Sequence, residues 1–365
     1  MNLPKLKIGN LVAKLPVIQG GMGIGVSLSK LSSAVANEGG IGIISGAQTG
    51  FREKNFRTDN NRANVNGIIK EIKKARNLSP NGILGINILK ASNNYFELVK
   101  TAVKEKIDLI ISGAGLPIKL PSFVKNTKTK IVPIISSGRA AKLITKVWKK
   151  RYDYLPDAIV VEGKKAGGHL GFKKKDLDNN SIKPLKEIVK DVINVINPFE
   201  QKHNQKIPII AAGGIYTGED IKDFLEIGAS GVQMATRFVA AEECDADIEF
   251  KKAYINATKE DICFIESPVG MPGRVIKNHF VEKYTNNNLD SVDSCYKCLK
   301  RCNPKTALFC ITDALIKAVN GDTENGLIFI GENGYRVNKI STVKEIFEDI
   351  KKSFDLKKEK LNSLI

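Results

Sequence analysis

Eight short apolar segments, separated by stretches of helical periodicity, constrain the fold of this 365-residue chain more than any other feature. Most are rich in Ile and Val without strict alternation, as is typical of strands buried on both faces of a parallel sheet. They are Pro16–Gln19, Ile41–Ser45, Leu84–Leu89, Leu109–Ser112, Ile131–Ser136, Ala158–Glu162, Ile207–Ala212 and Gly231–Ala235. Helical stretches between them include Ser27–Asn37, Asn66–Arg76, Tyr95–Lys104, Ala140–Lys150, Ile182–Ile196 and Gly218–Ile227.

Alternating strands and helices predict an α/β fold with a parallel sheet, and eight such units favour closure into a barrel. An open doubly wound sheet would also alternate. However, the first strand–helix turn, Gly21-Met22-Gly23-Ile24-Gly25, lacks the G-x-G-x-x-G spacing of dinucleotide-binding sheets. We therefore expect a (β/α)8 barrel of the TIM type over residues 1–240.

The alternation of apolar strands and helical stretches stops after residue 240. Helical material at Phe250–Thr258 and Thr312–Asn320 flanks a glycine- and proline-rich loop at Ser267–Arg274, and a short extended segment, Leu327–Ile330, precedes a Lys/Glu-rich terminal helix. These residues contain too few apolar strands for a second barrel half. We expect residues 241–365 to form an appended, mostly helical region packed at the barrel mouth.

The net charge of +18 raises the question of a nucleic-acid ligand. The lysines are scattered along the chain and are not interleaved with aromatic residues, as a groove for single strands would require. A solvated basic surface explains them better, and steering of an anionic acyl carrier or coenzyme A thioester is the alternative. The sequence has no run of 18 apolar residues and no signal pattern after Met1, so we expect a cytoplasmic protein that does not enter membranes.

Two of the predicted strands end in small residues that can approach an anion closely. Gly213 and Gly214 follow the seventh segment, and the eighth runs into Thr236. Glycine has no Cβ to hold a ligand away, and the loops after the last two strands of a β/α barrel commonly bind phosphate. This predicts a phosphorylated cofactor or substrate, with flavin mononucleotide (FMN) as the leading candidate. Ordinary strand–turn–helix connections are the alternative.

One of the three histidines has a position that suggests catalysis. His169 follows Gly167 and Gly168 just beyond the sixth strand, at the end of the barrel where catalytic groups of this fold lie. A neutral imidazole is the usual proton-transfer group near pH 7. A structural hydrogen-bonding role is the alternative. His203 lies in a polar segment and is expected at the surface, and the role of His279 is open.

The second unusual feature is a group of cysteines, Cys295, Cys298, Cys302 and Cys310, with C-x2-C-x3-C-x7-C spacing. In a cytoplasmic chain these are reduced thiols or ligands. The spacing suits an iron–sulfur cluster or a structural zinc ion, and free thiols are the alternative. In either case we expect the four sulfur atoms to lie close together.

Taken in order, a series of short motifs resembles one known family over about residues 10–280. The motifs are Gln19-Gly20-Gly21-Met22-Gly23, Gly85-Ile86-Asn87-Ile88, Ser112-Gly113-Ala114-Gly115, Glu162-Gly163, Ala166-Gly167-Gly168-His169-Leu170-Gly171, Ala211-Ala212-Gly213-Gly214-Ile215 and Gln233-Met234-Ala235-Thr236-Arg237-Phe238. The series resembles the nitronate monooxygenase family, formerly called 2-nitropropane dioxygenases, which also contains FMN-dependent enoyl-acyl-carrier-protein reductases.

The resemblance implies non-covalent FMN. It places Gly21 and Met22 under the flavin ring, Asn87 in polar contact with the ring, and the Gly167–Gly168 loop beside it. His169 becomes the catalytic histidine at the reactive face of the flavin. The full set of implied cofactor-binding residues is Gly21, Met22, Asn87, Glu162, Gly167, Gly168, Gly213, Gly214, Gln233, Ala235 and Thr236. Relatives often carry glycine where this chain has Ala235.

The main functional hypothesis is an FMN-dependent oxidoreductase that oxidises alkyl nitronates with dioxygen. The alternatives are an NAD(P)H-dependent enoyl-thioester reductase using FMN and, from another class, a non-catalytic nucleotide- or metal-binding module. An inosinate-type dehydrogenase would need a cysteine on the loop after the sixth strand, and that loop has none. The expected partner is a small-molecule substrate, with NAD(P)H and a homo-oligomer as further expectations.

Overall fold

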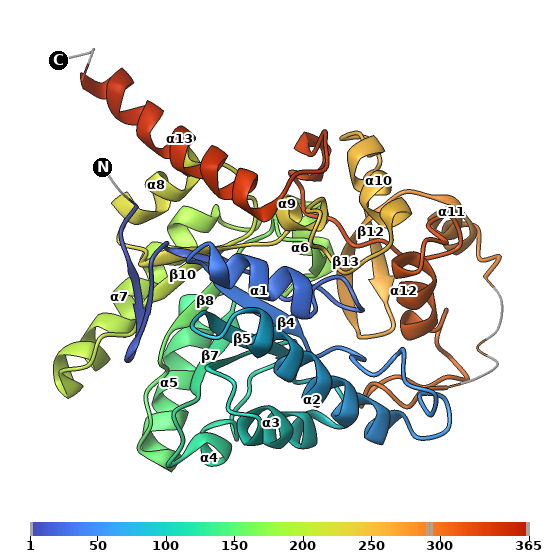
Figure 1. Ribbon diagram of the computed structural model, residues 1–365, viewed down its shortest axis with the longest axis horizontal. Coiled ribbons are helices and arrows are strands. Elements are labelled where there is room, and N and C mark those ends of the chain that lie inside the picture. Colours follow the sequence, from blue (N-terminus) through green and yellow to red (C-terminus); the bar gives the residue numbers. More distant parts are fainter. Residues whose placement is uncertain (1–2, 290–291, 293–294, 363–365) are drawn as a thin grey trace.

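The computed structural model describes residues 3–289, 292 and 295–362, and it contains the predicted barrel. Within these residues, eight parallel strands close in the order β10-β11-β3-β4-β5-β6-β7-β8 (Figure 1). Their bounds are β3 Val17–Gln19, β4 Ile41–Ser45, β5 Ile83–Leu89, β6 Leu109–Gly113, β7 Lys130–Ile135, β8 Ile159–Glu162, β10 Ile209–Ala212 and β11 Gly231–Met234. The expected strands and their closure into a barrel are thus confirmed, with end shifts of a few residues.

Helices surround the barrel. They are α1 (Ser29–Asn37), α2 (Asn60–Leu78), α3 (Tyr95–Lys104), α4 (Pro121–Val124), α5 (Gly138–Tyr152), α6 (Lys174–Asp178), α7 (Leu185–His203), α8 (Gly218–Glu226) and α9 (Thr236–Val239). Two differ from expectation. Helix α2 begins at Asn60 because the Asp59 carboxylate caps it by accepting from the Arg62 N–H, and α7 continues through Pro198 to His203.

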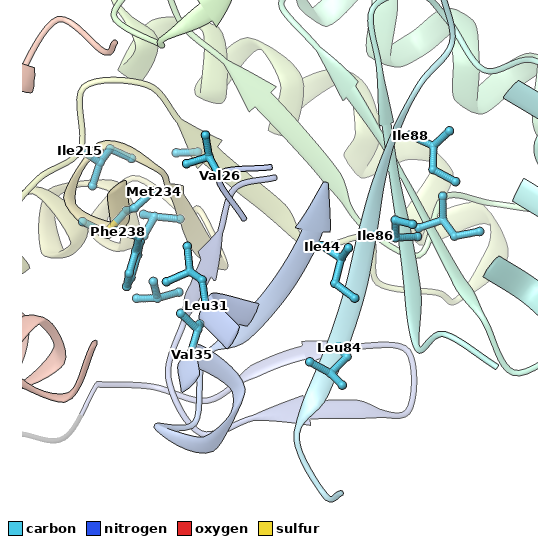
Figure 2. Close-up of a cluster of buried hydrophobic side chains, with 14 of the residues drawn as sticks. Val26, Leu31, Val35, Ile44, Leu84, Ile86, Ile88, Ile215, Met234 and Phe238 are labelled. Atoms are coloured by element: carbon cyan, nitrogen blue, oxygen red, sulfur yellow. The ribbon is translucent and has the colours of Figure 1, made fainter. Parts of the chain in front are cut away.

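The hydrophobic core has two layers, one inside the barrel and one between the strands and the helices. Ile44 of β4 and Leu84, Ile86 and Ile88 of β5 belong to the outer layer, as do Leu31 and Val35 of α1 (Figure 2). Another cluster contains Leu6 and Ile8 together with strand residues such as Ile18, Ile41 and Ile210. Leu6 and Ile8 belong to an unpredicted hairpin, β1 (Leu6–Ile8) with β2 (Leu11–Ala13), which turns at Gly9.

The residues beyond 240 contain α10 (Ile248–Asn256), α11 (His279–Thr285), α12 (Ile311–Val319), η1 (Gly334–Arg336) and α13 (Val343–Asn362). They also form an antiparallel hairpin, β12 (Ile262–Ser267) with β13 (Met271–Ile276), where the sequence predicted a loop. Because glycine and proline are typical of loops, the sequence pattern of this segment did not indicate a hairpin. Strand β13 also pairs with β9 (Gly168–His169), which lies in the loop after β8.

The terminal helix α13 lies against the outside of the barrel rather than at its mouth. In Figure 1 it runs beside α8, and the side chain of Ser353 accepts from the Gly218 N–H at 2.8 Å. Asp349 forms an ion pair with Arg237 at 2.8 Å, and Phe347 packs on Phe238. The domain boundary at residue 240 stays a prediction. No helix in the described ranges is long and apolar enough to span a membrane.

Candidate functional site

A cavity of about 650 Å³ opens at the carboxyl ends of the barrel strands. All of the residues predicted to bind the cofactor, together with His169, line it. These lining residues are Gly21, Met22, Asn87, Glu162, Gly167, Gly168, Gly213, Gly214, Gln233, Ala235 and Thr236. The size lies within the range of roughly 300–1,000 Å³ usual for ligand and cofactor pockets. The structure therefore brings the predicted set together in one place.

The floor of the cavity is a glycine-rich segment that follows β3. A Cβ on Gly21 would lie only 2.5 Å from the Asn87 Cβ and 3.2 Å from the Ile43 Cγ2, so a side chain cannot be accommodated without movement. Ser27 holds the segment in place, because its hydroxyl accepts from the Met22 N–H at 2.8 Å. The close approach to β4 and β5 explains why this position requires glycine.

The loops after β10 and β11 form the end of the cavity predicted to hold phosphate. Gly213 and Gly214 have φ angles of +106° and +80°, a conformation that glycine adopts without strain. Across from them, a Cβ on Gly331 would lie 2.5 Å from the Thr236 hydroxyl. The Asn333 amide donates to the Gly214 carbonyl at 2.6 Å and ties residues 331–333 to this loop.

His169 lies in strand β9 rather than in an open loop. Its Nε2 is 2.7 Å from the Ser267 hydroxyl, and its ring packs edge-on against Phe329 with a centroid distance of 4.8 Å. Pairing of β9 with β13 places Gly273 opposite His169. Burial lowers the pKa of His169 to about 4, so its imidazole is neutral at physiological pH.

Glu162 is the acidic group of the cavity wall at the end of β8. Burial raises the pKa of its carboxyl to about 7, and a hydrogen bond from the Gly171 N–H partly offsets this effect. A carboxyl group that titrates near neutrality can hold or release a proton at working pH.

A charged cluster fixes the loop between Glu162 and His169. The Arg274 guanidinium donates to the carbonyls of Lys164 and Ala166 and lies 3.3 Å from the Glu332 carboxylate. Glu332 also pairs with Lys165 at 3.0 Å. These contacts join the loop after β8 to residues that lie far away in the sequence.

The comparisons with known proteins agree with this geometry. A family model described as nitronate monooxygenase matches residues 5–353. The chain belongs to the nitronate monooxygenase family. Enzymes of this family depend on FMN, and the chain is a flavin-dependent oxidoreductase. The alternative of a non-catalytic module therefore has no support.

Individual relatives are distant in sequence, and the similarity extends over most of each chain. A probable nitronate monooxygenase of Staphylococcus aureus (strain MSSA476) is 25% identical over 303 residues, or 78% of this chain and 81% of the relative. FabK from Thermotoga maritima is similar in structure, with a TM-score of 0.74, 28% identity and 96% of each chain covered. A nitroalkane oxidase from Streptomyces ansochromogenes shares the fold, with a TM-score of 0.73, 18% identity and coverage of 96% and 98%.

The cavity fits the FMN on which the nitronate monooxygenase family depends. The Oε1 atom of Gln233 is buried and has no hydrogen-bond partner within the described part of the chain. A buried acceptor of this kind is costly unless a ligand supplies a donor, and the flavin ring carries one N–H group. The glycine floor leaves room for a planar ring, and Gly213, Gly214 and Thr236 offer N–H and hydroxyl groups suited to a phosphate.

The cysteines do not form a metal site in this structure. No group of three or more His, Cys, Asp or Glu side chains among the described residues is arranged to hold a metal ion, so an iron–sulfur cluster or zinc at Cys295, Cys298, Cys302 and Cys310 has no support. All four are free thiols. They do lie near one another. Burial mainly, and neighbouring thiols to a lesser degree, raise the pKa values of Cys298, Cys302 and Cys310.

Three residues of the cavity region were missed by sequence reasoning. Ser267 and Phe329 contact His169 from distant parts of the chain, and nothing in their local sequence signals this. Lys165 packs against Gly214, since a Cβ there would lie 2.8 Å from the lysine Cβ. The signal in the sequence was the position of Lys165 just after the sixth predicted strand, where the functional residues of a barrel lie.

Proposed function

We propose that this enzyme oxidises alkyl nitronates with dioxygen, using FMN held in the large cavity. The observation that carries the proposal is the placement of a neutral imidazole, His169, in the wall of a cavity that fits the flavin. When bound, FMN would supply the redox chemistry of the reaction, in which the nitronate is the electron donor and dioxygen the final oxidant. The protein supplies binding, orientation and proton control.

The cofactor is held from opposite ends of the cavity. Gly213, Gly214 and Thr236 would hold the phosphate, and the stem of Lys165 packs beside Gly214 while its ammonium pairs with Glu332. Gly21 and Met22 would support the ring, and Asn87 and Gln233 would offer it polar contacts. Gly167, Gly168, Glu162 and Ala235 complete the wall.

His169 positions the substrate. Its Nε2 and the Ser267 hydroxyl form one hydrogen-bonding unit, and the side chains of Phe329 and Met271 line the same cavity. The imidazole can donate to an oxygen of the nitronate, and the apolar side chains accommodate its alkyl group and exclude water. A bound anion would favour the protonated imidazole and raise its pKa.

The second candidate is an NAD(P)H-dependent reductase of enoyl thioesters. It is favoured by a second, basic cavity beside the first, lined by Lys90, Lys300 and Arg301. A small nitronate has no need of such a cavity. Both candidate reactions use the same flavin site.

Turnover assays separate these candidates. We expect purified enzyme to release FMN on heating, and to consume dioxygen and produce nitrite with propyl-2-nitronate. The reductase candidate predicts instead that NADPH or NADH bleaches the flavin anaerobically and that crotonyl-coenzyme A restores its colour. Nitrite production without added NAD(P)H supports the main proposal, and its absence together with NAD(P)H-dependent crotonyl reduction refutes it.

A further inference from the structure

Arg274 of β13 is a buried cation that lies behind one loop of the flavin cavity. Only 6% of its surface is exposed, and its guanidinium lies 4.7 Å from the ring centroid of Phe264, the residue opposite it on β12. Burying a charge costs free energy unless partners satisfy it, so the contacts of this guanidinium indicate its role. Arg274 itself is not among the described residues that line the cavity.

Three consecutive carbonyl groups of the loop after β8 are held by Arg274 and Glu332. The guanidinium donates to the carbonyl of Lys164 and, through Nε at 3.2 Å, to that of Ala166. The N–H of Glu332 donates to the carbonyl of Lys165 at 3.1 Å. The Glu332 carboxylate lies 3.3 Å from the Arg274 guanidinium and 3.0 Å from the Lys165 ammonium, which fixes it in turn. Arg274 and Glu332 therefore set the orientation of the peptide planes between residues 164 and 167.

This restraint also sets the direction of the Gly167 N–H. The Ala166–Gly167 peptide is trans, and in a planar trans peptide the C=O and N–H groups point in opposite directions. Because the Ala166 carbonyl points toward the guanidinium, the Gly167 N–H points away from Arg274. Ala166 and Gly167 line the cavity and Arg274 does not, so this direction is toward the cavity.

Gly167 lies at the end of the cavity that is predicted to hold phosphate. A Cβ on Gly331 would lie 2.5 Å from the Thr236 hydroxyl and 3.8 Å from the Gly167 nitrogen, so the three residues are close neighbours. A Cβ on Gly213 would lie 3.0 Å from the Ala166 nitrogen. The Ala166–Gly167 peptide is thus next to both loops that are predicted to bind the phosphate.

We propose that Arg274 is a positioning residue for the cofactor phosphate. It holds the Ala166–Gly167 peptide so that the Gly167 N–H is a further donor to the phosphate. A donor that is oriented in advance binds an anion without the cost of ordering the loop. Glu332 balances the charge of Arg274, so Arg274 acts through orientation rather than through direct attraction. The inference rests on the proposed FMN site and does not depend on the identity of the substrate.

The test compares the binding of FMN with that of riboflavin, which has the same ring system and no phosphate. Enzyme stripped of flavin is titrated with each ligand, and quenching of flavin fluorescence gives the two Kd values. The variants are Arg274→Met and Arg274→Lys. A loss of phosphate contact changes the ratio of the two Kd values, whereas general damage to the cavity weakens both ligands.

Arg76→Met is the matched control. Arg76 also donates to the carbonyl of a loop residue, Gly82, at 2.7 Å and pairs with a carboxylate, that of Asp108, at 2.6 Å. Gly82 and Asp108 directly precede β5 and β6, so these contacts lie at the end of the barrel opposite the cavity. Melting temperatures of the flavin-free proteins report any loss of stability in the control and in the Arg274 variants.

Arg274→Met is expected to raise the Kd of FMN about tenfold, the usual value of one hydrogen bond to a charged group, and to leave the Kd of riboflavin nearly unchanged. Arg274→Lys should restore only part of the FMN affinity, because lysine keeps the charge but lacks the fork that reaches two carbonyls. Arg76→Met should lower the melting temperature without changing either Kd.

Three results would overturn the proposal. They are unchanged FMN affinity in both Arg274 variants, an equal loss of affinity for FMN and riboflavin, and full recovery in Arg274→Lys, which would assign the effect to charge alone. If Arg274→Met does not fold, the ratio of Kd values in Arg274→Lys decides. Because neither titration contains a nitronate or NAD(P)H, failure of the proposed reaction cannot be mistaken for failure of this inference.

Discussion

The Nε2 atom of His169 lies 2.7 Å from the Ser267 hydroxyl, although 98 residues separate the two in the sequence. Strands β9 and β13 create this relationship, because they join the loop after β8 to the C-terminal hairpin. The hydrogen bond fixes the orientation of the imidazole in the cavity wall. The C-terminal region is thus part of the site and does not merely cover it.

Substitutions at this pair test its role. His169→Ala should retain FMN and fold but lower turnover about 100-fold, the usual contribution of a positioned acid–base group. Ser267→Ala should lower turnover less, on the order of tenfold, because Ser267 acts through the orientation of His169. His203→Ala, at the far end of α7, is the control. Steady-state kinetics measures these effects, and unchanged turnover in His169→Ala would count decisively against the assignment.

The half-buried His169 also predicts how stability depends on pH. The folded-state pKa of His169 is lowered to about 4, below its unfolded value of 6.5, so the unfolded chain binds more protons between these values. The contribution of His169 to the free energy of unfolding should therefore fall as pH decreases from about 6.5 to 4, whereas that of Glu162, whose pKa is raised to about 7, rises as pH decreases through part of the same range. Urea unfolding of apo-enzyme measures this decrease in the free energy of unfolding. The decrease should be smaller by roughly 1–3 kcal/mol in His169→Gln. Equal pH slopes in the two proteins would rule out a histidine that is buried in its neutral form.

A matched pair of glycine substitutions tests the cavity floor. Gly21→Ala should weaken FMN binding strongly, because the new Cβ would lie 2.5 Å from the Asn87 Cβ. Gly20→Ala in the same segment should be tolerated, since its Cβ would be 3.4 Å from the nearest atom, the Gln233 Cγ. Flavin fluorescence titration measures both Kd values. Similar affinities for the two variants would show that the floor does not fix the ring.

The free cysteines should differ in reactivity. Cys295 is exposed, whereas Cys244 is buried and burial raises its pKa to about 12. Maleimide should therefore label Cys295 first and Cys244 only after unfolding. Mass spectrometry of timed samples locates the labels, and metal analysis of the same preparation accompanies it. Stoichiometric zinc or iron that protects all four clustered thiols would restore the metal hypothesis.

The barrel, the Gly213–Gly214 loop and the position of His169 were predictable from local patterns in the sequence, whereas other lining residues, such as Asn87 and Gln233, followed only from the resemblance to the family. Strands buried on both faces give apolar runs, and glycines after β3 and β10 mark close approaches. The hairpins were harder to predict. The Gly9-Asn10 pair between β1 and β2 is a turn signal in the sequence, whereas Pro272 in β13 is typical of a loop.

The partners of His169 could not be predicted, because pairing between distant segments leaves no local trace. Ser267 and Phe329 reach the imidazole only through the tertiary arrangement of β9, β13 and residue 329. The proximity of Lys90 to Lys300 has the same origin. Sequence patterns identify which residues are able to act, and the fold determines which of them meet.

The most direct test of the central claim is anaerobic mixing of the FMN-loaded enzyme with propyl-2-nitronate, followed at the absorbance of the flavin. The account predicts rapid loss of the oxidised flavin bands without NAD(P)H, recovery of the bands when dioxygen is admitted, and a slower loss in His169→Ala. An unchanged flavin spectrum with nitronate, together with rapid bleaching by NADH or NADPH, would contradict it.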